Sequence, residues 1–259
     1  MGHLRLSTLP RTERWGKVLQ HLDEGASVSD IARDTFWAAY SGLSKVPVDA
    51  GFTQTLTTIF SFVDALQSRN PVAALQQKGF DVTRDSSLFD FIGSFQERAR
   101  QSAVEVRAHS DLSQMAQESF ARVLMDTAGS SLPTLFGLQS GDADKALKRS
   151  LSGQNLGRTM HEFFVGFTQK YLNYYLGRAL PARVGISKAL ANVDKHSEFG
   201  KSFDLFVRQT VRITDEFTPG WFGKARFEGR LSRTEVSKFA HTAFKKIRSE
   251  FKRGAIGHG

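Results

Sequence analysis

Apolar residues recur at helical spacing along most of the chain. The most aromatic stretch is 156–180, where apolar residues are separated by three or four positions: Leu156, Met160, Phe163, Phe167, Tyr171 and Tyr174. This spacing places them on one face of a helix. Phe164, Tyr175 and Leu176 widen that face. Burial accounts for so many aromatic rings, so we expect a central helix here rather than a ligand surface.

The other periodic segments are bounded by helix start and stop signals. Starts are marked by Ser27, Asn70–Pro71, Ser87 and Ser232, and ends by Gly25 and Gly79. We predict helices over residues 11–22, 27–40, 52–67, 71–79, 87–107, 111–129, from 143 onward, and over 156–180, 198–217 and 232–253. The chain has only six prolines. The pattern therefore predicts an all-α fold, a compact bundle of about nine to eleven helices, in one unit or in two closely packed helical subdomains.

The remaining segments are predicted to be loops, with one short strand. Residues 80–84 alternate between apolar and polar side chains, which is typical of a strand. We expect loops at 42–51 and 218–231, and a mixed segment at 181–195. Residues 129–144 are rich in Gly and Ser and are the best candidate for an internal boundary.

Charge is distributed unevenly between the two halves of the chain. Residues 1–130 contain 13 Lys/Arg and 15 Asp/Glu, whereas residues 131–259 contain 22 and 11, a net charge of −2 against +11. We therefore divide the chain into a near-neutral half, 1–130, and a basic half, 131–259, which can still form one continuous domain. Such asymmetry favours a polyanion or an acidic protein as the partner.

The basic half ends in an amphipathic helix that begins with a capping box, Ser232 and Glu235. Its apolar residues form a continuous stripe, and six basic residues lie outside that stripe: Lys238, Lys245, Lys246, Arg248, Lys252 and Arg253. A helix of this kind can also lie on a membrane surface. We favour burial of the stripe in the protein core.

The predicted loop before this helix mixes aromatic and basic residues. Trp221, Phe222 and Phe227 interleave with Lys224, Arg226 and Arg230, which places stacking faces beside phosphate-binding charges. Our candidate contact surface for nucleic acid or for an acidic partner consists of Trp221, Phe222, the three cations of this loop and the six cations of the helix.

Catalytic and cofactor motifs are absent from the sequence. There is no cysteine, no phosphate-binding glycine loop and no nucleophile elbow. His161 and Glu162 resemble the start of the zinc motif H-E-x-x-H, but Val165 occupies the second histidine position. We predict no metal and no cofactor. No apolar stretch approaches the ~20 residues of a membrane span, and the first residues lack a secretory signal. We expect a cytoplasmic protein that does not insert into membranes.

Three functional hypotheses follow. The first is a non-enzymatic helical subunit of a larger bacterial assembly, which contacts the phosphate backbone of nucleic acid through its basic half. The second is a protein–protein adaptor that binds an acidic partner through Trp221, Phe222 and the C-terminal helix. The third is an enzyme of unrecognised type whose site is assembled only in three dimensions.

Overall fold

The computed structural model describes residues 12–129, 141–179 and 193–254. Within these ranges the chain forms eleven α-helices, one short 3₁₀ helix and no strand, which confirms the all-α prediction. The elements are α1 (Glu13–Glu24), α2 (Val28–Leu43), η1 (Val46–Val48), α3 (Ala50–Leu66), α4 (Pro71–Gln77), α5 (Leu88–Glu105), α6 (Asp111–Gly129), α7 (Asp142–Ser150), α8 (Gly153–Ala179), α9 (Val193–Val211), α10 (Ile213–Phe227) and α11 (Arg233–Gly254).

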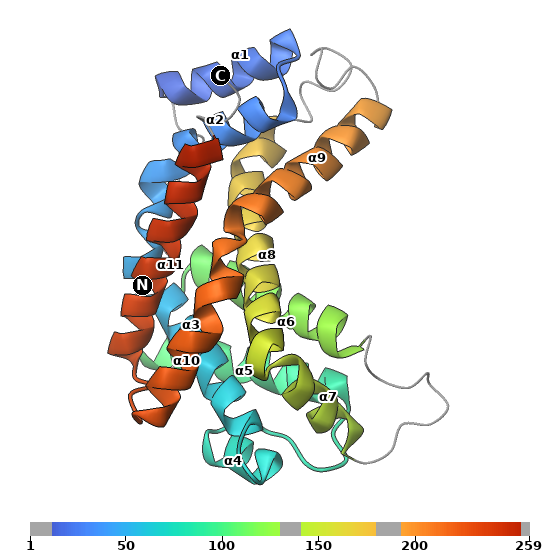
Figure 1. Ribbon diagram of the computed structural model, residues 1–259, viewed down its shortest axis with the longest axis vertical. Coiled ribbons are helices and arrows are strands. Elements are labelled where there is room, and N and C mark those ends of the chain that lie inside the picture. The colour runs from blue at the N-terminus through green and yellow to red at the C-terminus, as the bar shows by residue number, and fades with distance from the viewer. Residues whose placement is uncertain (1–11, 130–140, 180–192, 255–259) are drawn as a thin grey trace.

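Two helices form the centre of the bundle. Helix α3 is buried on almost every side, as expected for a helix with apolar residues all around its circumference. Helix α8 runs lengthwise through the middle of the molecule and packs against α2, α6, α7, α9 and α10 (Figure 1). The aromatic residues of its inward face, among them Phe163, Phe167 and Tyr171, are fully buried. The prediction of a central helix at 156–180 is therefore confirmed.

The remaining helices surround this centre. In Figure 1, α1 and α2 lie at the top, α4 and α7 lie at the bottom, and α11 runs along one side. Helix α11 packs against η1, α3, α9 and α10, so the end of the chain contacts both halves of the sequence. Contacts between α6 and α8 and between α2 and α9 also join the two halves.

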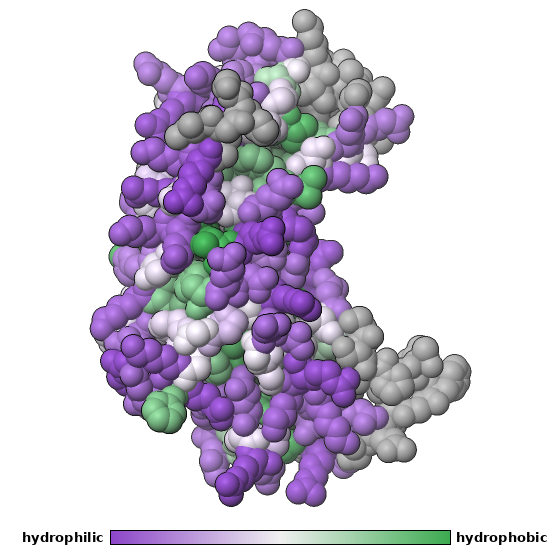
Figure 2. Space-filling view, viewed as in Figure 1, coloured by the Kyte–Doolittle hydropathy of each residue, from purple (hydrophilic) through white to green (hydrophobic). Residues whose placement is uncertain are grey.

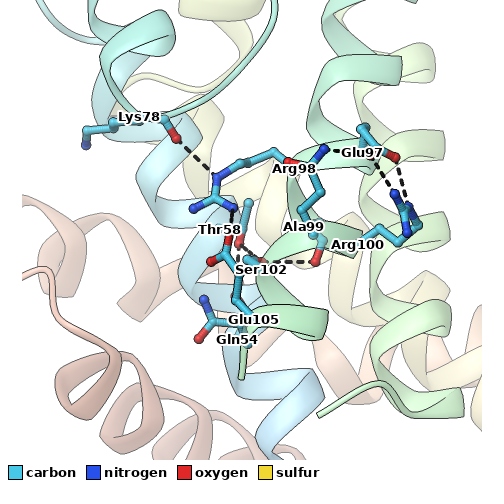
Figure 3. Close-up of polar contacts among 10 residues, drawn as sticks. Gln54, Thr58, Lys78, Glu97, Arg98, Ala99, Arg100, Ser102 and Glu105 are labelled. Atoms are coloured by element: carbon cyan, nitrogen blue, oxygen red, sulfur yellow. Dashed lines mark hydrogen bonds and ion pairs between the residues drawn. The ribbon is translucent and has the colours of Figure 1, made fainter. Parts of the chain in front are cut away.

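Local capping explains where several helices begin and end. The Ser27 and Asn70 side chains accept hydrogen bonds from the backbone N–H groups of Asp30 and Ala73, as their positions predict. Gly25 and Gly79 adopt the left-handed conformation after α1 and α4. Arg98 of α5 closes over the second of these turns, donating to the Lys78 carbonyl at 3.3 Å (Figure 3).

The predicted strand at residues 80–84 is wrong. This segment is an irregular connection without a partner strand among the described residues, and Phe80 and Val82 are buried. The Val82 carbonyl accepts a hydrogen bond from the Gln76 side chain at 2.8 Å. The alternation in the sequence therefore arises from two side chains, Phe80 and Val82, that are buried in the core. The Val82 carbonyl is hydrogen-bonded to a side chain of α4 instead of to a neighbouring strand.

The predicted boundary between a helix at 198–217 and a loop at 218–231 is wrong, although residues 198–211 are helical and residues 228–231 lie outside any helix. The helix ends at Val211, and a second helix, α10, begins at Ile213 and continues to Phe227 through Pro219. Proline leaves the carbonyl four residues earlier, that of Asp215, without its helical donor. Packing against α8 compensates for this, because Gly157 lets the two helices approach closely at Asp215 and Pro219.

Two sequence predictions fall mainly on residues outside the described ranges. They are the internal boundary at 129–144 and the mixed segment at 181–195.

Candidate anion-binding surface on the C-terminal helix

Helix α11 is held against the bundle by its apolar stripe. Phe239, Ala243, Ile247 and Phe251 are almost completely buried. The ring of Phe251 stacks on Phe36 of α2, with ring centres 3.7 Å apart and an interplanar angle of 8°. The apolar face is therefore buried in the core and is not available to a membrane surface.

A row of basic side chains follows the opposite side of α11. Lys238, Lys245, Arg248 and Lys252 are exposed, and with His241 they are separated by three or four positions. This spacing aligns them along one line of the helix surface. We call Lys238, Lys245, Arg248 and Lys252 the basic stripe; at 1.5 Å per residue it extends for about 21 Å. Hydrophilic side chains cover most of the side of the molecule along α11 (Figure 2).

Only one carboxylate contacts the basic stripe within the described ranges. Lys238 lies 2.7 Å from Glu235, and its hydrogen bond lowers the pKa of that carboxyl. Arg248 donates to the Tyr40 hydroxyl, and its guanidinium lies 5.2 Å from the centre of the Tyr40 ring. Lys245 and Lys252 have no ion pair with any described residue. The stripe therefore keeps most of its positive charge.

The other two predicted cations of the helix lie off the stripe. Lys246 and Arg253 follow Lys245 and Lys252 by one position, which rotates them by about 100° around the helix. Lys246 lies over the Phe217 ring at 5.6 Å, and Arg253 forms an ion pair with Glu250 at 2.8 Å. These contacts partly neutralise the positive charge that Lys246 and Arg253 place on the neighbouring face of α11.

A cavity of about 270 Å³ lies beside the basic stripe. The end of α2, the following turn and η1 form one wall with Tyr40, Leu43, Ser44 and Pro47. Helix α11 forms the other wall with His241, Phe244, Lys245 and Arg248. None of these eight described residues is acidic, so the cavity presents positive and hydroxyl groups above an apolar floor. From the sequence we considered His241 only as one residue near which a pocket would favour an enzyme, and we assigned Tyr40 no role in a site. The spacing of His241 between Lys238 and Lys245 was the available signal for a place in the basic row.

Two of the predicted aromatic contacts of residues 218–231, Trp221 and Phe222, pack in or against the core instead. Phe222 is 3% exposed and stacks near Phe60, with ring centres 5.7 Å apart. Trp221 is half-buried between Phe60 and Phe239, with ring centres 4.8 and 4.3 Å away. Because α10 is a helix, every third or fourth residue turns inward, and these two rings face the bundle. Phe222 therefore does not offer the stacking platform, or the adaptor anchor, that we inferred for a loop. Phe227, the last residue of α10, is 93% exposed.

The cations of the same segment have different surroundings. Arg226 links α10 to the end of α3, because its Nε donates to Asp64 at 2.8 Å. Burial acts to raise the pKa of Asp64, but the hydrogen bonds from Lys78 and Arg226 outweigh it and lower the pKa. Arg230 pairs with Glu228, and Lys224 is exposed. This group lies where α11 begins, at the other end of that helix from Lys252 (Figure 1).

A second polar cavity, of about 330 Å³, lies where α6, α8 and α9 meet. Its charged residues are balanced: Asp126, Glu162 and Asp204 are opposed by Arg122, Lys170 and Arg208. His161 borders this group, with its Nε2 3.0 Å from the Arg208 carbonyl oxygen. No three potential ligands gather into a metal site within the described residues. The cavity is therefore a region of mutual ion pairs that connects three helices.

Comparisons of the chain with protein-family models, with curated proteins and with solved structures found no match. Among the helices described, none is long and apolar enough to cross a bilayer.

Proposed function

We propose that α11 binds the phosphate backbone of nucleic acid through the basic stripe. The observation that carries this proposal is the row Lys238, Lys245, Arg248 and Lys252, which is exposed and aligned over about 21 Å with one carboxylate in contact. An extended row of charge matches an extended polyanion better than it matches a small ligand. The protein would act as a binding subunit, in agreement with the first hypothesis drawn from the sequence.

The proposed interaction is with phosphates rather than with bases. Lysine and arginine contacts to phosphate oxygens position a protein on nucleic acid and carry no sequence information. Phe222, which we expected to stack on bases, is buried in the core. Binding should therefore be weakly selective for sequence and strongly dependent on salt.

The first test is a titration of labelled single- and double-stranded DNA and RNA, followed by fluorescence anisotropy at ~50 and ~200 mM salt. About four phosphate contacts on duplex DNA correspond to a loss of about 10²-fold in affinity over this range. An affinity that does not change with salt would contradict the proposal. Absence of binding at the lower salt would also contradict it, and would leave an acidic protein as the partner to be sought.

A charge-matched comparison separates the stripe from net charge. The triple variant K245Q/R248Q/K252Q removes three cations of the stripe, and we expect the slope of log affinity against log salt to fall by about three. The control K17Q/K201Q/R212Q removes three exposed cations on α1, on α9 and in the turn before α10. It should bind almost as well as the unchanged protein. Equal weakening in both variants would show that only the net charge matters.

A further inference from the structure

The cavity beside the basic stripe has the composition of a small anion site. His241, Lys245 and Arg248 lie at positions i, i+4 and i+7 of α11 and line the same cavity. Residues at this spacing lie above one another on a helix. The opposite wall adds the hydroxyl-bearing residues Tyr40 and Ser44. A group that enters the cavity therefore meets three basic side chains and no carboxylate from its lining.

Arg248 is already oriented for this task. Its guanidinium lies over the Tyr40 ring and donates one hydrogen bond to the Tyr40 hydroxyl. Guanidinium has five N–H donors, so most of them are not used by that bond. A cation held against an aromatic ring loses less conformational freedom when it binds an anion.

The C-terminal end of a helix carries partial negative charge. The end of α2 would therefore repel an anion if its last carbonyl groups had no hydrogen-bond donors. Two of these carbonyls have donors. The N–H of Ser44 donates to the Tyr40 carbonyl at 2.9 Å, and the N–H of Lys45 donates to the Gly42 carbonyl at 3.0 Å. These two hydrogen bonds reduce the negative charge that the end of α2 presents to the cavity.

From this juxtaposition we infer that the cavity binds the terminal phosphate of a nucleic-acid strand, while the rest of the strand follows the basic stripe. The inference rests on the proposed function and specifies its substrate. A terminal phosphate carries about −1.5 to −2 charges at pH 7 and three acceptor oxygens, more than an internal phosphodiester does. At about 270 Å³ the cavity is at the small end of ligand pockets, which suits one group at the end of a chain.

The test compares one short single strand in three forms, with a phosphate at the 5′ end, with a phosphate at the 3′ end, and with hydroxyls at both ends. Binding to the full-length protein is measured at one salt concentration. We expect one phosphorylated form to bind about tenfold more tightly than the hydroxyl form, the size of effect that one charge-assisted hydrogen bond supplies. Inorganic phosphate, added at constant ionic strength, should abolish this preference.

Two variants test whether the preference for a phosphorylated strand arises in the cavity. His241→Gln changes the cavity, and we expect it to bring the affinities of the phosphorylated and hydroxyl strands close together. Lys252→Gln changes the stripe outside the cavity, and should weaken both strands while keeping their ratio. Both residues are exposed, and thermal unfolding of each variant checks that the fold is unchanged.

The outcomes distinguish this inference from the proposed function. Salt-dependent binding with equal affinity for all three strands overturns the inference and leaves the proposed function in place. A preference that survives His241→Gln also overturns it, because the terminal phosphate then binds elsewhere. Absence of binding to every strand overturns both.

Discussion

At the scale of single residues, Gly157 is a position where packing leaves no room for a side chain. A Cβ atom added there would lie 2.4 Å from the Asp215 carbonyl oxygen and 3.0 Å from Cγ of Pro219. The backbone of α10 cannot move away without losing its contact with α8. We therefore expect Gly157→Ala to destabilise the protein by about 1 to 3 kcal/mol, measured by urea unfolding.

The matched control is Gly93→Ala in α5. This glycine also lies inside a helix, but an added Cβ meets no atom within 4 Å. Alanine should stabilise the protein here by about 0.5 to 1 kcal/mol, because it restricts the unfolded chain. If both variants shift stability in the same direction, the close approach of α8 and α10 is not what constrains Gly157.

Some residues of the candidate site could be predicted from the sequence, and others could not. The exposed cations Lys245 and Lys252 were predicted correctly as surface charges, because a polar position opposite an apolar stripe faces solvent. Phe222 and Arg226 were grouped with them through proximity in sequence. One is buried and the other is bonded to Asp64 of α3, 162 positions earlier in the chain. A contact between residues so far apart in the chain cannot be recognised from the sequence around either residue.

At the scale of elements, His161 connects α8 to α9. Its ring Nδ1 lies 3.5 Å from Glu162, which also accepts a hydrogen bond from Arg208. Burial acts to lower the pKa of His161, but the hydrogen bonds with Glu162 and with the Arg208 carbonyl outweigh it and raise the pKa. The charged form of the histidine is therefore favoured by folding.

This raised pKa makes the α8–α9 connection dependent on pH. Its stabilising contribution is fully present below the unfolded value of 6.5 and is lost as the pH rises through the higher folded pKa. The free energy of unfolding should thus decline above pH 6.5. We expect His161→Gln to flatten the decline by about 1 kcal/mol in urea titrations across this range.

Glu162→Gln should flatten the profile in the same way, because it removes the acceptor that favours the charged histidine. A decline that keeps its full size in both variants would show that the pH dependence does not come from the contact between His161 and Glu162.

The helices themselves were largely predictable, whereas one whole element was not. Caps such as Ser27 and Asn70 are local signals, and the structure confirms them. Helix α10 was not predicted, because its sequence contains Pro219 and a glycine on either side of Trp221–Phe222. These residues predict a loop from local preference, and packing against α8 overrides that preference. At the start of α11, the Ser232 hydroxyl accepts a hydrogen bond from the Glu235 backbone N–H at 3.4 Å. The Glu235 carboxylate accepts from Lys238, and the Ser232 N–H donates to the Arg230 carbonyl, so one of the two hydrogen bonds of the predicted capping box is formed.

At the scale of the whole molecule, the division of charge at about residue 130 does not coincide with a division of the core. Helix α11 of the basic half packs on α3 of the near-neutral half, and α8 packs on α6. Arg226 binds Asp64 across the same division. Composition therefore describes the surface of the two halves, and the core is shared between them.

This shared core leads to a prediction about unfolding. Separation of the halves would expose the apolar faces of α3, α6, α8 and α11 together, so neither half has a complete core of its own. We expect one thermal transition, with equal calorimetric and van't Hoff enthalpies. Fragments 1–130 and 131–259, expressed separately, should lack a cooperative transition because each leaves an apolar surface without its covering helices. Two resolved transitions, or one fragment that unfolds cooperatively alone, would establish two subdomains instead; the basic half would then be the fragment in which to look for binding.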